Sequence, residues 1–191
     1  MELKQERCAL MMERDIYRPV GKEYLHVNDD KILKINQLYI EKLKLYAQQN
    51  ASRKCTMCLH NDVRAHVHEM INVYPAGAYV RPHSHPLKTE TKTILEGVMS
   101  IFLFDDNGEI KDYFTMEQGG IFTFRIDRGI IHTNIPLTDV VFYEVVTGPF
   151  VGEDDSVFPV WAPEPADIER VSTFMKELEE YNTYLLDRRM K

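Results

Sequence analysis

Short apolar segments separated by turn residues run from Val67 to Val146, and this series restricts the fold most strongly. The segment HVHEMINVY (66–74) alternates between two faces, and VMSIFLF (98–104) is typical of a buried strand. The DDNG sequence that follows (105–108) is typical of a hairpin turn. Many short strands with no helical spacing between them predict a β-sandwich or a β-barrel.

The sequence predicts one amphipathic helix on each side of the strands. The first spans Asn28 to about Asn50, with Asn28 or Asp29 as its N-cap. The second runs from about Pro165 to Asp187, with the proline near its first turn. The apolar stripes of these helices consist of Ile32, Ile35, Tyr39 and Tyr46 in the first and Ile168, Val171, Met175, Leu178 and Leu185 in the second.

Composition excludes several classes of protein. The chain has 191 residues, which suits one domain, and its net charge of −7 with a pI of about 5.5 argues against a nucleic-acid surface. No apolar run reaches the roughly 20 residues that a membrane-spanning helix needs. The first residues, MELKQERCALMMERD, are too charged for a signal peptide, and the cysteine count of three is odd. We therefore expect a cytoplasmic protein.

Two histidines and a glutamate lie close together in the segment GAYVRPHSHPLKTETKTILEG (77–97). Alternate residues of a strand project to the same face, so His83 and His85 can point to one place. Glu90 follows after a turn at Pro86 and can return a carboxylate on the neighbouring strand. Two imidazoles and a carboxylate that meet in this way suit a divalent metal ion.

The spacing of these residues resembles the first signature of the cupin superfamily, from Gly77 through His83, His85 and Glu90 to Gly97. The second signature is looser, with Gly120, then Asp127 and Gly129, then His132. Asp127 stands where cupins usually have proline. The resemblance implies a cupin double-stranded β-helix, or jelly-roll barrel, in which the metal ligands are His83, His85, Glu90 and His132.

Longer stretches resemble the WbuC family of cupin metalloproteins: RPHSHP, LEGVMSIFLFDDNGEI, HTNIPLTDVVFYEVVTGPF and VWAPEP. This resemblance covers roughly residues 29 to 165 and implies a link to bacterial surface-polysaccharide synthesis without supplying a reaction. We expect an N-terminal arm (1–27) with a short strand near Tyr24–Val27, a cupin domain with its leading helix (28–165), and a C-terminal helix (166–191) packed on the barrel or on a partner. Because many cupins pair, a homodimer is expected.

Three histidines and one carboxylate leave a bound divalent ion with a net charge near +1, and an octahedral ion keeps two positions free for water or a ligand. Ligand types of this kind suit iron, manganese, nickel or zinc without choosing among them. Arg81 and Lys88 flank the ligands and can hold an anionic group. Tyr79 and Tyr143 are expected to line the same pocket. Glu144 shares a strand face with Phe142 and Val146, where a carboxylate is expected only beside a polar cavity, and it is the candidate acid or base.

The leading hypothesis is a metal-binding cupin that takes a small polar or anionic metabolite, such as a sugar derivative. Isomerisation or epimerisation is the chemistry that fits an open metal beside Glu144, and oxygenase chemistry would require a redox-active metal. The alternative is a non-catalytic, metal-dependent binding or regulatory module. A separate C-x-x-C site at Cys55 and Cys58, with His66 and His68 downstream, has histidine spacing unsuited to a zinc finger.

Overall fold

The computed structural model describes residues 17–20, 24–27 and 32–189, with side chains described from 32 to 183. The elements, in chain order, are β1 (Tyr17–Val20), β2 (Tyr24–Val27), α2 (Gln37–Gln49), β3 (Cys55–Cys58), β4 (Val67–Tyr74), β5 (Glu90–Glu96), β6 (Met99–Phe104), β7 (Ile110–Met116), β8 (Thr123–Ile126), β9 (Ile131–Pro136), β10 (Val140–Thr147), the 3-10 helix η1 (Gly152–Asp155) and α3 (Ile168–Arg189).

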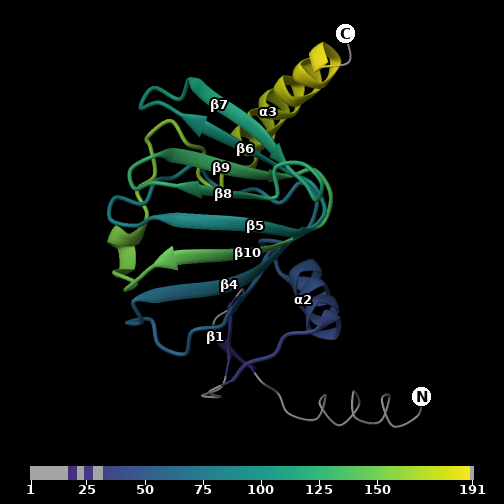
Figure 1. The fold of residues 1–191 in the computed structure, drawn as a ribbon. Helices are drawn as coiled ribbons and strands as arrows, with labels where there is room; N and C mark the ends of the chain where they lie inside the picture. The colour runs from purple at the N-terminus through teal and green to yellow at the C-terminus, as the bar shows by residue number, and fades with distance from the viewer. Residues whose placement is uncertain (1–16, 21–23, 28–31, 190–191) are drawn as a thin grey trace, which may run out of the picture.

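Two sheets form the body of the protein (Figure 1). The larger sheet has the strand order β1-β2-β3-β4-β10-β5-β8, and the smaller has the order β7-β6-β9. Strand pairing is antiparallel except between β2 and β3, where it is parallel. The predicted jelly-roll class, mainly β with an N-terminal and a C-terminal helix, is confirmed. The strand expected near Tyr24–Val27 is present as β2, while most of the predicted N-terminal arm lies outside the described residues.

The interior between the sheets has an apolar half and a polar half. Ile94 of β5 and Phe142 of β10 pack in the apolar half against Ile101 of β6. Because side chains of a strand alternate between faces, Glu90 of β5 and Glu144 of β10 project to the same inner side as these apolar residues. The strands therefore carry their polar residues into the barrel at one end of the apolar core.

Helix α2 covers the outer face of the larger sheet, where Leu43 and Ala47 are fully buried against Met57 and Ile71. The predicted start of this helix at Asn28 or Asp29 lies outside the described residues, and residues 32–36, which were predicted to be helical, are not. Residues 33–36 have no regular secondary structure, and Ile35 packs against the core from there. The helix begins after Asn36, whose side chain accepts hydrogen bonds from the backbone N–H groups of Leu38 and Tyr39. Asn36 satisfies the free donors of the first turn and therefore sets the boundary.

Helix α3 packs on the outer face of the smaller sheet, at the other end of the barrel from α2 (Figure 1). Its residues Phe174, Met175 and Leu178 contact an aromatic cluster that includes Phe102 and Phe104 of β6. Ile168, which was expected in the buried stripe, is 72% exposed because the helix meets the sheet only from its second turn. Across the described part of the chain, no helix combines the length and apolarity needed to cross a membrane.

Gly97 joins β5 to β6 and has a positive φ of 82°. A Cβ at this position would lie 2.2 Å from the carbonyl oxygen of Asp139, so the backbone of the turn between β9 and β10 leaves no room for a side chain. Gly77 has a similar φ of 70°, but a Cβ there would meet no atom within 4 Å. A side chain at Gly77 would therefore meet backbone strain alone, whereas one at Gly97 would meet both strain and steric overlap.

We expect Gly97→Ala to lower the free energy of unfolding by more than about 3 kcal/mol, because strain and overlap add. Gly77→Ala should cost only about 1–2 kcal/mol, since strain acts alone there. Urea unfolding of both variants measures the difference. Equal losses would show that the contact with Asp139 is relieved by a small backbone shift.

Candidate metal centre

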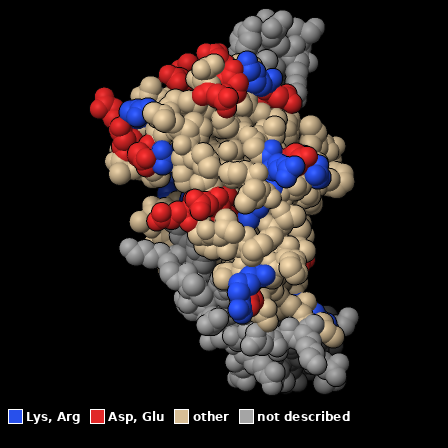
Figure 2. All heavy atoms as spheres, turned by 90° about the vertical axis from the view of Figure 1, so that its left-hand side faces the viewer, with Lys and Arg blue, Asp and Glu red and all other residues tan. Residues whose placement is uncertain are grey.

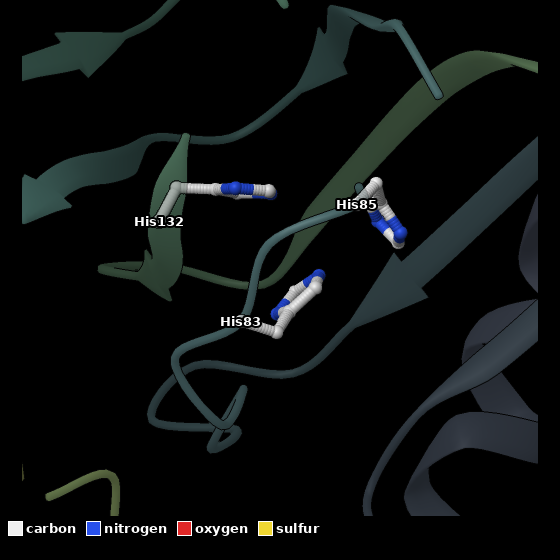
Figure 3. A group of neighbouring side chains, drawn as sticks. All are labelled: His83, His85 and His132. Atoms are coloured by element: carbon white, nitrogen blue, oxygen red, sulfur yellow. The ribbon is translucent and has the colours of Figure 1, made fainter. Parts of the chain in front are cut away.

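Three histidines from two segments meet inside the barrel (Figure 3). His132 lies on β9, and the backbone of His83 pairs with it through two hydrogen bonds of 2.9 and 3.0 Å. His85 follows two residues later, as its spacing predicted. One ring nitrogen from each of His83, His85 and His132 lies within 4.8 Å of the others, a grouping that could hold a metal ion.

Each of the three rings is oriented by a backbone carbonyl. The Nδ1 atom of His83 lies 2.8 Å from the carbonyl oxygen of Arg81, that of His85 lies 2.7 Å from Asp155, and that of His132 lies 3.0 Å from Ile130. A carbonyl oxygen only accepts hydrogen bonds, so Nδ1 must carry the proton in each ring. The lone pair of a neutral ring is therefore on Nε2. Oriented histidines of this kind are typical of metal ligands.

Glu90, the first residue of β5, places a buried carboxylate against two of these nitrogens. Its Oε2 lies 3.3 Å from Nε2 of His85, and its Oε1 lies 3.6 Å from Nε2 of His132. Burial alone would raise the pKa of Glu90, but Lys92, His132 and His85 outweigh it and hold the pKa well below its usual value. The carboxylate is thus available as an anionic ligand.

The pKa values of two histidines shift in opposite directions. Burial, reinforced by His132, lowers the pKa of His83 well below its usual value, so this ring is neutral and able to coordinate. Burial also acts to lower the pKa of His85, but the Glu90 carboxylate and the Asp155 carbonyl outweigh it and raise the pKa overall. Protons therefore compete for His85 before they compete for His83.

The donor set fits a divalent metal ion. Three Nε2 lone pairs and a carboxylate face one small volume, and Nε2 of His132 is buried with no hydrogen-bond partner among the residues that the structure describes. Such a convergence of acceptors is unfavourable unless a cation or protons lie between them. Ligands about 2.1 Å from one ion lie roughly 3–4 Å apart, so a small inward movement of the rings would complete the site.

A cavity of about 420 Å³ opens beside this cluster. This volume suits a small metabolite. Its wall comes mainly from β3, β4, β5, β10 and the segment after β10. The lining residues are Thr56, Cys58, His60, Val63, His68, Met70, Asn72, Tyr74, His83, His85, Lys88, Glu90, Glu144, Val146, Phe150, Asp155 and Ser156.

A chain of polar contacts crosses the cavity wall from strand to strand. Thr56 of β3 donates a 2.5 Å hydrogen bond to Asn72 of β4, and Asn72 donates a 2.7 Å hydrogen bond to Glu144 of β10. Lys92 of β5 lies 3.4 Å from Glu144 and also pairs with Glu90. Burial raises the pKa of Glu144, although Lys92 acts against the rise. Glu144 therefore lines the cavity and is linked to the histidine cluster through Lys92.

The segment after β10 closes the cavity on one side. The carboxylate of Asp155 pairs with the buried ammonium of Lys88, and its backbone carbonyl orients His85. Lys88 lines the cavity and has an anionic partner already beside it. Figure 2 shows this side of the molecule, where acidic side chains form a band and basic ones are scattered. Glu153 and Asp154 of η1 are exposed.

Three residues expected in the pocket lie outside its wall in the described part of the chain. Arg81 pairs with Glu164 at 2.8 Å, and Tyr79 donates a 2.8 Å hydrogen bond to the carbonyl of Pro163. Both therefore hold the segment that leads into α3. Tyr143 donates a hydrogen bond to Glu69 on the outer face of the larger sheet. This placement follows from strand alternation, because Tyr143 is adjacent to the inward-facing Glu144.

Cys55 and Cys58 do not form a common site. Cys55 packs with the residues beneath α2, while Cys58 lines the cavity, so the two side chains lie on opposite faces of the sheet. Burial, with a smaller effect of Glu144, raises the pKa of Cys58 to about 12. A thiol of this kind is protonated and unreactive at neutral pH.

A jelly roll with three histidines and a buried glutamate at one end of its interior is the arrangement that the resemblance to cupins implies. In sequence comparisons, residues 35–116 match a family described as a domain of unknown function, DUF6016. This match covers less than half of the chain. No curated protein sequence matches the chain.

Several solved structures are similar to part of this chain. CapF from Staphylococcus aureus, described as a capsular polysaccharide assembling protein, is 23% identical over 50% of this chain and 27% of its own, with a TM-score of 0.43. Oxalate decarboxylase from Bacillus subtilis is 14% identical over 55% of this chain and 27% of its own, with a TM-score of 0.44. The conserved protein SPY1581 from Streptococcus pyogenes, described as of unknown function, is 17% identical over 66% of this chain and 96% of its own, with a TM-score of 0.46. At these values the function must be argued from the site itself.

Proposed function

We propose that this protein binds a divalent transition metal ion through His83, His85, His132 and Glu90. The observation that carries the proposal is the orientation of the three rings. Each Nδ1 atom faces a backbone carbonyl, which leaves Nε2 as the atom that can coordinate a metal ion. The buried carboxylate of Glu90 supplies the fourth ligand. Iron, manganese, nickel and zinc all accept this donor set.

The cavity beside the metal would hold a small polar or anionic metabolite. Its polar wall of Thr56, Asn72 and Glu144 offers hydrogen bonds to hydroxyl groups, and Lys88 offers a cation to an acidic group. A sugar derivative linked to surface-polysaccharide synthesis satisfies these requirements and follows from the family resemblance of the sequence. Homodimer formation and a cytoplasmic location remain predictions.

If the protein is an enzyme, isomerisation or epimerisation is the reaction class that we propose. A bound metal ion supplies a Lewis acid that polarises a ligand oxygen. Glu144 is the candidate to accept and return a proton, because its raised pKa lies closer to neutrality than that of an exposed carboxylate. Asn72 and Lys92 hold the Glu144 carboxylate in place for this role.

The test begins with metal content after purification without chelators, and with the melting temperature before and after chelation. We expect about one equivalent of metal, and stabilisation of about 2.7 kcal/mol at free metal 100-fold above the dissociation constant. A melting temperature that chelation leaves unchanged would contradict the metal site. The loaded protein is then screened with sugars and small carboxylates. Saturable binding without turnover would favour the non-catalytic module.

A further inference from the structure

Lys92 is a lysine that lies almost entirely inside the barrel, with 2% of its surface exposed. Its ammonium pairs with Oε1 of Glu90 and lies 3.4 Å from both Oε1 of Glu144 and Oδ1 of Asn134. Lysine is rarely buried to this extent unless it is paired. A single ammonium is thus the counter-charge of two buried carboxylates, and one of these, Glu90, is a proposed metal ligand.

The two carboxylates need a cation when the metal is absent. A buried carboxylate without a counter-charge is strongly unfavourable, and a pair of them repel each other. Lys92 supplies this charge in the metal-free protein. When a metal ion binds Glu90, it brings two further positive charges close to the ammonium, in an interior where charges interact strongly. The metal and Lys92 then share the same anion.

We propose that Lys92 is a positioning residue that acts as an internal counter-cation, holding Glu90 in place in the metal-free protein and competing with the metal for its charge. This inference rests on the proposed metal binding. A residue that only supported the site would raise its affinity for metal. The native lysine instead lowers that affinity. The benefit is a Glu90 carboxylate that is already held in place before the ion binds and after it leaves.

Substitutions of Lys92 and of its neighbour in space, Glu144, should shift the metal affinity in opposite directions. We expect Lys92→Met to bind Co²⁺ at least about tenfold more tightly, because a competing cation is removed. Glu144→Gln should bind Co²⁺ more weakly by several-fold, because an anion is lost and Lys92 is left to pair with Glu90 alone. Titration followed by the visible spectrum of the bound ion measures both. A purely structural role for Lys92 would weaken binding in both variants.

Lys44→Met is the matched control, because Lys44 also bridges two glutamates, Glu41 at 2.9 Å and Glu96 at 2.6 Å, but on the outer surface. Its Co²⁺ affinity should equal that of the wild type. Unchanged or weaker binding by Lys92→Met would overturn the inference while leaving the proposed function standing. If the wild type itself takes up no metal, both fail. If Lys92→Met folds only with metal present, Lys92→Gln, which removes the charge but keeps a hydrogen-bonding group, replaces it in the titration; tighter Co²⁺ binding supports the inference, and unchanged or weaker binding overturns it.

Discussion

Replacing His85 with alanine is expected to remove most of the metal-dependent stabilisation while leaving the metal-free protein folded. The loss should approach about 2.7 kcal/mol at free metal 100-fold above the wild-type dissociation constant. Loss of one of four ligands, together with the orienting bond to Asp155, is the physical reason. The fold should survive because the His85 side chain lines the cavity and is 13% exposed. Thermal melting with metal and with chelator measures the increment.

His66→Ala is the matched control for this substitution, since His66 is exposed and lies outside the cavity wall. Its metal-dependent increment should equal that of the wild type. A His85→Ala protein that keeps the full increment would show that the metal binds elsewhere. A His85→Ala protein that melts far below the chelated wild type would instead show that His85 supports the fold directly.

The second large effect concerns pH, and metal-dependent stability should fall steeply between about pH 7.5 and about pH 5. A histidine must be neutral to coordinate, and its unperturbed pKa is about 6.5. The pKa of His85 is raised in the metal-free protein, so protons begin to displace the metal above that value. The stabilisation by metal is therefore fully present above about pH 7.5 and is lost as the pH falls toward about 5. From His85 alone, the metal affinity should drop at least about 30-fold by about pH 5.

For His85 in the metal-free protein the sign is reversed. The raised pKa of His85 means that its protonated form is favoured by folding, which adds stability at low pH and loses it as pH rises through the folded-state pKa. Melting curves of chelated and metal-loaded samples should therefore converge as pH falls. A constant gap between the two curves from about pH 7.5 to about pH 5 would contradict histidine ligation.

Local spacing was enough to predict those site residues that lie on one strand or are separated by a single turn. His83, His85 and Glu90 lie close together in the sequence, and strand alternation directs Glu144 inward, so these positions were predictable. The same alternation on β5 places Lys92 on the inner face with Glu90. It was missed because a lysine is expected at the surface unless a partner is known, and its partner Glu144 comes from another strand.

Other placements depend on contacts that the sequence does not reveal. Tyr79 and Arg81 face the segment before α3 because Pro163 and Glu164 hold them there, more than 80 residues along the chain. The start of α2 was predicted too early because the apolar spacing continues into residues 33–36, where Leu33 and Ile35 pack against the core without being helical. Only the side-chain hydrogen bonds of Asn36 identify the first turn.

The proposed ligands also change the connectivity of the chain. Glu90 begins β5 and His132 lies on β9, so an ion held by both would close a loop of about 40 residues that contains β6, β7 and β8. A cross-link of this length lowers the entropy of the unfolded chain in the same way as a disulfide. With metal bound, these strands could not separate fully from the rest of the barrel unless the ion were released first. Hydrogen exchange at their amides would then depend on the lifetime of the metal complex.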